Sequence, residues 1–185
     1  MTTTGPGRRA LLAATALAPV AALPAEAVAQ AAAAPDRPIL IRGAHVLTMD
    51  AGLGDLPLGD ILIEGGVIRA VAPSIEAAGA LVIPGADRIA MPGMVNGHVH
   101  LAQTMQRGLS TEHSFGSYFQ QIVLRHSNRM TPDDVRLADH AGGLEQLATG
   151  VTTVMDWSRE TMSPDHADAA IAGLTAAGIR AVLAY

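Results

Sequence analysis

The chain has 185 residues, 49% of them hydrophobic, and a formal net charge of −5. This length and apolar content are typical of a folded domain. The acidic balance, without a lysine or arginine cluster, excludes the electrostatic pattern of a nucleic-acid partner and favours a small-molecule substrate. Because the sequence has no cysteine, a metal would have to be held by histidine, aspartate or glutamate.

Residues 1–29 have the pattern of a cleaved export signal. Arg8-Arg9 precedes an apolar stretch from Ala10 to Leu23, and Ala27-Val28-Ala29 follows as a small-x-small cleavage pattern. The stretch is shorter than the roughly 18 residues that span a bilayer, so we expect no membrane anchor in the mature chain and an exported, periplasmic or secreted, protein. The paired arginines loosely resemble a twin-arginine signal, and a general secretory signal is the alternative. Residues 30–37 follow as a linker.

Residues 38–91 predict the N-terminal part of a small antiparallel β-sandwich module. Short runs rich in β-branched residues are separated by turn residues, and Gly65-Gly66 predicts a tight hairpin between the second and third runs. The runs are Ile39 to Met49, Ile61 to Ile63, Val67 to Val71 and Leu81 to Ile83.

Residues 92–185 predict alternating strands and helices. Thr131-Pro132-Asp133-Asp134 is an N-cap followed by proline and acids, and Gly150 supplies a stop, so a helix of about five turns fits between them. Leu137, Leu144 and Leu147 are expected on one face of this helix. A strand from Val151 to Met155, a second helix from Ser163 to Gly178 and a strand from Arg180 to Tyr185 follow. This order predicts parallel β/α units.

Two histidines end the first strand of this series, in Pro92-Gly93-Met94-Val95-Asn96-Gly97-His98-Val99-His100. Side chains at i and i+2 leave a strand on the same face, so both imidazoles can approach one point. Such a pair can also be solvated or hydrogen-bonded without a metal. Its position at the carboxyl end of a strand, where catalytic groups of (β/α)₈ barrels lie, favours a metal site.

The motif resembles the amidohydrolase superfamily, specifically its cytosine-deaminase and triazine-hydrolase branch. The similarity includes Met91 to Leu101, with Asn96 where hydantoinase-like members usually carry aspartate, and it covers nearly all of residues 38–185. Its other parts are Gln103, Arg107-Gly108-Leu109, Thr131 to Val135, Gly150 to Trp157 and Ala177 to Ala181.

This resemblance implies a TIM-barrel enzyme with one Zn²⁺ or Fe²⁺ ion per site, a small-molecule substrate and a homo-oligomeric assembly. His98 and His100 correspond to the two metal ligands of the first strand. The family also uses a third histidine, a histidine with a glutamate, and an aspartate from later strands, which we expect beyond Tyr185. Residues 92–185 would then be the beginning of a (β/α)₈ barrel, about three of eight strands, so we expect an incomplete chain that is inactive alone.

Further residues near the strand ends are candidates for weaker roles. Gln103, Asp156 and Trp157 are candidate substrate contacts, although loop structure explains them equally well. Arg107 is expected to brace the loop, and the aromatic stripe of Phe115, Tyr118 and Phe119 is expected to pack. The other histidines are expected to be structural or solvated; they are His45, His113, His126, His140 and His166.

The leading hypothesis is a metal-dependent amidohydrolase that deaminates a nitrogen heterocycle through a metal-activated water. One alternative is a non-catalytic metal-binding or interaction module in which the two histidines persist without acid-base groups. Another keeps the enzyme but makes the substrate a cyclic amide. The acid-base residues themselves are not assigned within these 185 residues.

Overall fold

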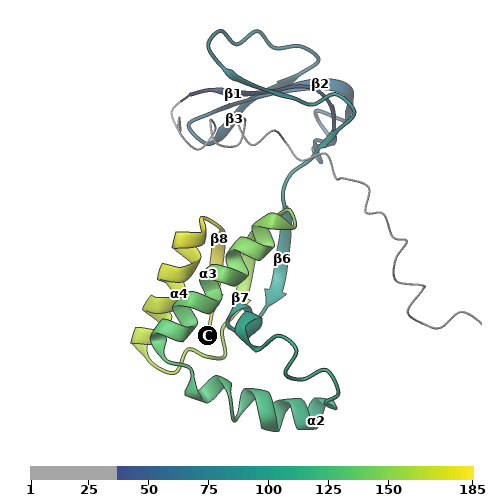
Figure 1. The fold of residues 1–185 in the computed structure, drawn as a ribbon. Helices are drawn as coiled ribbons and strands as arrows, with labels where there is room; N and C mark the ends of the chain where they lie inside the picture. The colour runs from purple at the N-terminus through teal and green to yellow at the C-terminus, as the bar shows by residue number, and fades with distance from the viewer. Residues whose placement is uncertain (1–36) are drawn as a thin grey trace, which may run out of the picture. The chain divides into compact units, whose positions relative to one another are not determined.

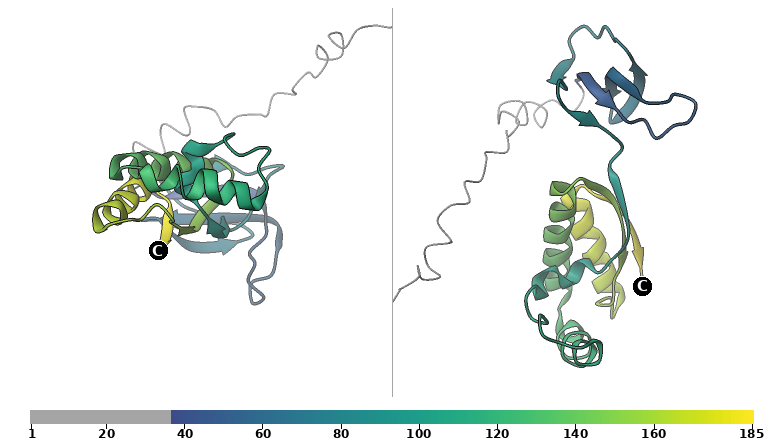
Figure 2. Two further views of the ribbon diagram at one scale, coloured as in Figure 1. Left: turned by 90° about the horizontal axis from the view of Figure 1, so that it is seen from below. Right: turned by 90° about the vertical axis from the view of Figure 1, so that its right-hand side faces the viewer.

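A computed structural model describes residues 37–185, and the predicted export signal lies outside the described residues. The described residues divide into two compact units, with the boundary between Met91 and Pro92. Figures 1 and 2 show the first as a β-sheet unit and the second as a sheet with helices. Within the described range, no helix combines the length and apolar character needed to cross a membrane.

The first unit is one sheet with the strand order β3-β2-β1-β4, to which β5 adds by pairing with β1. The hairpin between β2 and β3 turns at Gly65 and Gly66, with φ values of 56° and 75°, as the two glycines predict. The strands are β1 (Ile39–Val46), β2 (Leu56–Glu64), β3 (Val67–Ala72), β4 (Leu81–Pro84) and β5 (Ile89–Ala90).

The prediction of a purely antiparallel module is wrong for two strands of this sheet. β1 pairs antiparallel with β2 and β2 with β3, but β4 and β5 both run parallel to β1. The physical reason is the connection after β3, which brings the chain back to the beginning of β1, where Leu81 N–H donates to the Pro38 carbonyl at 2.8 Å. The result is a mixed sheet.

The second unit has a three-stranded parallel sheet in the order β6-β7-β8, which confirms the predicted strand and helix alternation. Its strands are β6 (Met94–Val99), β7 (Val151–Trp157) and β8 (Arg180–Ala184). The helices α3 (Pro132–Ala148) and α4 (Pro164–Ala177) cover one face of the sheet (Figures 1 and 2). The carboxyl ends of the three strands therefore meet at one edge.

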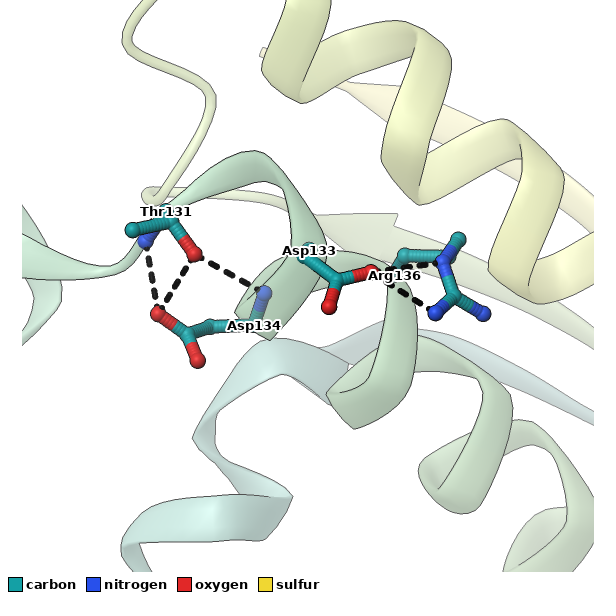
Figure 3. Close-up of polar contacts among 4 residues, drawn as sticks. All are labelled: Thr131, Asp133, Asp134 and Arg136. Atoms are coloured by element: carbon teal, nitrogen blue, oxygen red, sulfur yellow. Dashed lines mark hydrogen bonds and ion pairs between the residues drawn. The ribbon is translucent and has the colours of Figure 1, made fainter.

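Helix α3 begins with a complete capping box. The Thr131 hydroxyl accepts from the Asp134 amide at 3.2 Å, and the Asp134 carboxylate accepts from the Thr131 amide at 2.8 Å (Figure 3). Asp133 forms an ion pair with Arg136 one turn along. The local sequence thus provides partners for the amides of Thr131 and Asp134 at the helix start, which is why the start of the helix could be predicted.

The expected leucine face of α3 is confirmed for Leu147, which packs against the hydrophobic core of the unit, but is wrong for the other two leucines. Leu137 and Leu144 are 44% and 47% exposed. The buried positions instead include small residues such as Ala138 and Gly142, and the hydrophobic core of the unit is formed by Leu101, Val154, Leu174, Ala177 and Ile179. A Cβ at Gly173 of α4 would lie 2.4 Å from the Arg136 carbonyl oxygen of α3. The two helices approach so closely that small residues must form their contact.

Candidate metal-binding site

The end of β6 carries a β-bulge directly before the second histidine. Asn96 is opposite Val154 and Val99 opposite Asp156, so β6 has one residue more than β7 between these pairs. A bulge re-aims the side chains that follow it. The ring centroids of His98 and His100 lie 5.2 Å apart, with their planes at 84°. The two imidazoles are neighbours, as the i, i+2 spacing predicts.

The protonation of His100 follows from its hydrogen bond. Its Nδ1 lies 2.5 Å from the backbone oxygen of Trp157 at the end of β7. A carbonyl oxygen can only accept, so Nδ1 is the protonated nitrogen and Nε2 presents its lone pair. Histidine ligands of metal sites commonly have this arrangement, with one nitrogen fixed by a protein acceptor and the other free to coordinate.

The neighbouring imidazole is held by an aromatic contact. The His98 ring stacks on the indole of Trp157, with centroids 5.1 Å apart and planes at 19°. The Trp157 Nε1–H donates to the Gly97 carbonyl at 3.4 Å, and the Asn96 side-chain oxygen accepts from the His98 amide at 3.2 Å. One tryptophan on β7 thereby contacts both histidines of β6, by its backbone oxygen and by its ring.

A pocket of about 470 Å³ opens where the three strands end. Its lining includes His98, His100, Trp157, Ser158, Arg159 and Tyr185. Pockets of this size accommodate small organic ligands. The histidine pair therefore faces a space large enough for a heterocyclic substrate.

The donors present fit part of a metal coordination sphere. Residues 37–185 contain no group of three or more histidine, cysteine, aspartate or glutamate side chains arranged to hold an ion. Zinc in proteins takes at least three protein ligands. His98 and His100 can supply two neutral nitrogen ligands, and the free Nε2 of His100 is the observation that suits this role.

The structure brings only one of the three candidate substrate residues into the pocket. Trp157 lines it, whereas Asp156 is fully buried behind it and accepts a 3.0 Å hydrogen bond from the Leu101 amide. Gln103 exchanges hydrogen bonds with the Tyr118 hydroxyl, at 2.9 and 3.0 Å. Within the described residues, the side chains of Asp156 and Gln103 therefore stabilise the backbone and the loop around the site.

A loop with short helical turns connects β6 to α3 and contains the predicted bracing arginine. Arg107 forms an ion pair with Glu145 of α3, in agreement with that expectation, although both side chains are largely exposed. The hydrogen bond from Arg107 lowers the pKa of Glu145. The turns are η2 (Leu101–Gln106), α2 (Phe115–Tyr118), η3 (Phe119–Val123) and η4 (Ser127–Arg129).

The aromatic stripe of this loop does not pack as expected. Phe115 is 79% exposed and Phe119 40% exposed, and Tyr118 is tied to Gln103. The reason is that α2 continues directly into η3, and the residues this helical segment buries are Ile122 and Val123 rather than the aromatic ones.

Three carboxyl groups lie buried beneath the strand ends. Asp139 of α3, Asp156 of β7 and Glu160 after β7 are each 0% exposed. Both carboxylate oxygens of Asp139 and of Glu160 lack a hydrogen-bond partner within the described residues. Burial, together with the charges of Asp156 and Glu160, raises the pKa of Asp139 to about 8. Burial also raises the pKa of Asp156 to about 6, against the lowering effect of the Leu101 amide.

Sequence reasoning missed several residues around the site. Asp139 had a detectable signal, because it lies four residues after Val135 on the buried side of α3. Glu160 and the pocket residues Ser158 and Arg159 had none beyond following a strand end. Their burial or exposure depends on contacts between segments that are distant in sequence.

Comparison with known proteins identifies the family to which this fold and histidine pair belong. The model of the amidohydrolase family matches residues 89–185, more than half of the chain. The chain therefore belongs to the amidohydrolase family.

Several named proteins resemble the chain. It is 34% identical over 146 residues to the 5-methylthioadenosine/S-adenosylhomocysteine deaminase of Symbiobacterium thermophilum, covering 76% of this chain and 34% of the relative. It is 30% identical over 118 residues to a 5'-deoxyadenosine deaminase of Methanosarcina mazei, covering 64% and 27%.

A solved structure with the same fold is a mutant of atrazine chlorohydrolase from Arthrobacter aurescens TC1, complexed with zinc and atraton. It has a TM-score of 0.71 and 31% identity to this chain, and the match covers 80% of this chain and 35% of that one. The chain thus spans about a third or less of the length of these proteins.

Proposed function

We propose that the protein is a metal-dependent amidohydrolase that deaminates a nitrogen heterocycle. In this reaction water adds its oxygen to a ring carbon, the bond from that carbon to the amino nitrogen breaks, and ammonia leaves. The observation that carries the proposal is the geometry of His100, whose Nδ1 is fixed by the Trp157 carbonyl so that Nε2 is free beside His98. The relatives act on adenosine-type and triazine-type compounds by their names, which supports a heterocycle as substrate.

In this proposal, the residues of this chain bind the metal ion and the substrate and hold the histidine side chains in position. His98 and His100 hold one zinc or ferrous ion, which supplies a nucleophilic water at neutral pH when bound. Trp157 keeps both imidazoles in place, by its ring and by its backbone oxygen. Asp156 fixes the Leu101 amide and so the backbone that follows His100. The pocket admits the heterocycle beside the histidines.

Several finer features belong to the same proposal. The three parallel strands β6, β7 and β8 correspond to the first strands of a TIM barrel, and the mixed sheet before them to part of a β-sandwich. We also propose that the protein is exported, on the basis of the signal pattern in residues 1–29, and that it acts on a small molecule.

The proposal is tested on the protein expressed from its native gene. Its zinc and iron content is measured together with ammonia release from aminated purines and triazines. We expect His100→Ala to abolish metal uptake and ammonia release, and His98→Ala to do the same. His126→Ala is the matched control, because this histidine is exposed and lies in the loop before α3.

Three outcomes would contradict the proposal. Full metal content in His100→Ala would remove His100 from the coordination sphere. Metal binding without hydrolysis of any heterocycle would favour the non-catalytic metal-binding module. Ring-opened products without ammonia would instead indicate a cyclic-amide hydrolase.

A further inference from the structure

One cationic side chain lines the pocket beside the histidine pair. The other lining side chains are imidazole, indole, hydroxyl, phenol and aliphatic groups, and Arg159 adds a permanent positive charge to them. Arg159 lies two residues after Trp157, the last residue of β7. The charge is therefore close to the proposed metal site but belongs to a different strand end.

Arg159 forms no ion pair with any of the described residues. The ion pairs among residues 37–185 use four other arginines, Arg42, Arg69, Arg107 and Arg136. The acids that flank Arg159 are also not its ion-pair partners, because Asp156 and Glu160 are both buried at 0% exposure while Arg159 is exposed. Its guanidinium keeps donors available for a ligand.

The backbone that carries Arg159 is nevertheless fixed. The Ser158 amide donates to the Ala184 carbonyl of β8 at 2.9 Å, and the Ser158 hydroxyl accepts from Thr161 at 2.8 Å. Ser158 is 6% exposed and Glu160 fully buried, so both neighbours of Arg159 are anchored. An exposed arginine between two buried residues keeps its Cα in place at the rim of the pocket, which lowers the entropy lost when it binds.

We propose that Arg159 binds an oxyanion of the substrate, so that the preferred substrate is a nitrogen heterocycle bearing a carboxylate or phosphate group. This inference rests on the proposed function for the heterocycle and on the pocket for the anion. A guanidinium matches either oxyanion with two parallel hydrogen bonds. The pocket of about 470 Å³ has room for a ring and one charged substituent.

Binding can be measured without turnover, because Trp157 is the single tryptophan of the chain and lines the same pocket. Its fluorescence is titrated in the native protein with matched pairs of probes. Adenosine monophosphate is compared with adenosine for the phosphate, and orotate with uracil for the carboxylate. The pair with the larger difference identifies the anion. Inorganic phosphate alone tests whether the ring contributes.

We expect the anionic member of one pair to bind about tenfold more tightly than its neutral partner, an advantage that falls as salt rises. Arg159→Gln should remove this advantage and leave the affinity for the neutral member unchanged. Arg159→Lys should retain part of it, since lysine keeps the charge but not the paired geometry. Arg180→Gln is the matched control, an exposed arginine at the opposite end of β8.

The inference is overturned if the native protein binds neutral and anionic members equally, or if Arg159→Gln keeps the anionic preference. Either result leaves the proposed function intact, provided that neutral heterocycles are still deaminated. Conversely, an anionic preference that depends on Arg159 in a protein that releases no ammonia would uphold the binding role and defeat the proposed function.

Discussion

The amide of Leu101 donates a 3.0 Å hydrogen bond to Oδ1 of Asp156, joining the residue after His100 to the end of the neighbouring strand. Removing this acceptor frees the backbone that follows the proposed ligand. We predict that Asp156→Ala weakens zinc binding by about tenfold or more, as loss of supporting contacts around metal ligands usually does. Competition with a chromophoric chelator measures this.

Asp156→Asn keeps an oxygen acceptor for the Leu101 amide and should lose much less zinc affinity than Asp156→Ala. Asp133→Asn provides a control, since Asp133 is an exposed acid of α3 that pairs with Arg136. Equal zinc affinities for the alanine and asparagine variants of Asp156 would show that this hydrogen bond does not support His100.

The buried acids predict that stability falls as the pH rises. The pKa of Asp139 is about 8 in the folded protein, against an ordinary value of 3.8. Between these values the folded state holds a proton that the unfolded state has lost, so the free energy of unfolding decreases from about pH 4 to about pH 8. The Asp139→Asn variant cannot ionise at this position. As the pH rises through this range, its free energy of unfolding should therefore come to exceed that of the native protein by about one to several kcal/mol.

Urea unfolding at pH 5 and pH 8 tests this expectation for the native protein and the Asp139→Asn variant. The difference between the two proteins should be larger at pH 8. Parallel stability curves would mean that Asp139 titrates in the folded state near its ordinary value.

The capping box of α3 predicts the effect of replacing Thr131. Thr131→Ala removes the acceptor for the Asp134 amide and should lower the free energy of unfolding by about 1 kcal/mol. Thr131→Ser retains the hydroxyl and should be close to native. Arg136→Ala breaks only an exposed ion pair and should change stability by about 0.5 kcal/mol or less. Thermal unfolding that ranks Arg136→Ala as the most harmful would contradict this order.

Close packing of α3 and α4 makes Gly173 sensitive to a single methyl group. The added Cβ would lie 2.4 Å from the backbone oxygen of Arg136, which cannot rotate away. Gly173→Ala should therefore cost about 1–3 kcal/mol, measured by urea unfolding. Gly116→Ala in α2 is the matched control, because its Cβ would meet no atom within 4 Å and should be neutral or slightly stabilising.

The parts of the fold that depend on local chemistry could be predicted from the sequence. Thr131 and Asp134 determine the start of α3 through bonds three residues apart, and Gly65-Gly66 determines a turn by its own backbone freedom. The alternation of strands and helices in residues 92–185 follows from hydrophobic period and from helix caps in the same way.

The parts that depend on contacts between distant segments could not be predicted. The direction of β4 depends on its pairing with β1, whose partners lie about forty residues apart, as in Ile39 with Leu81. Leu137 is exposed, and the buried positions of α3 beside it are Val135 and Ala138. At the site, the spacing of His98 and His100 was informative, but the Trp157 carbonyl that sets the His100 tautomer is 57 residues away.

The bulge in β6 makes the histidine pair more sensitive to deletion than to substitution. Between Asn96 and Val99 the strand has one residue more than its neighbour β7. Deleting Gly97 would restore equal spacing and turn the residues on one side of the deletion to the opposite face of the sheet. Sequence drift in this strand can therefore proceed by exchange of side chains, whereas a change in the number of residues between Asn96 and His98 would turn both imidazoles together away from their present face of the sheet in a single step.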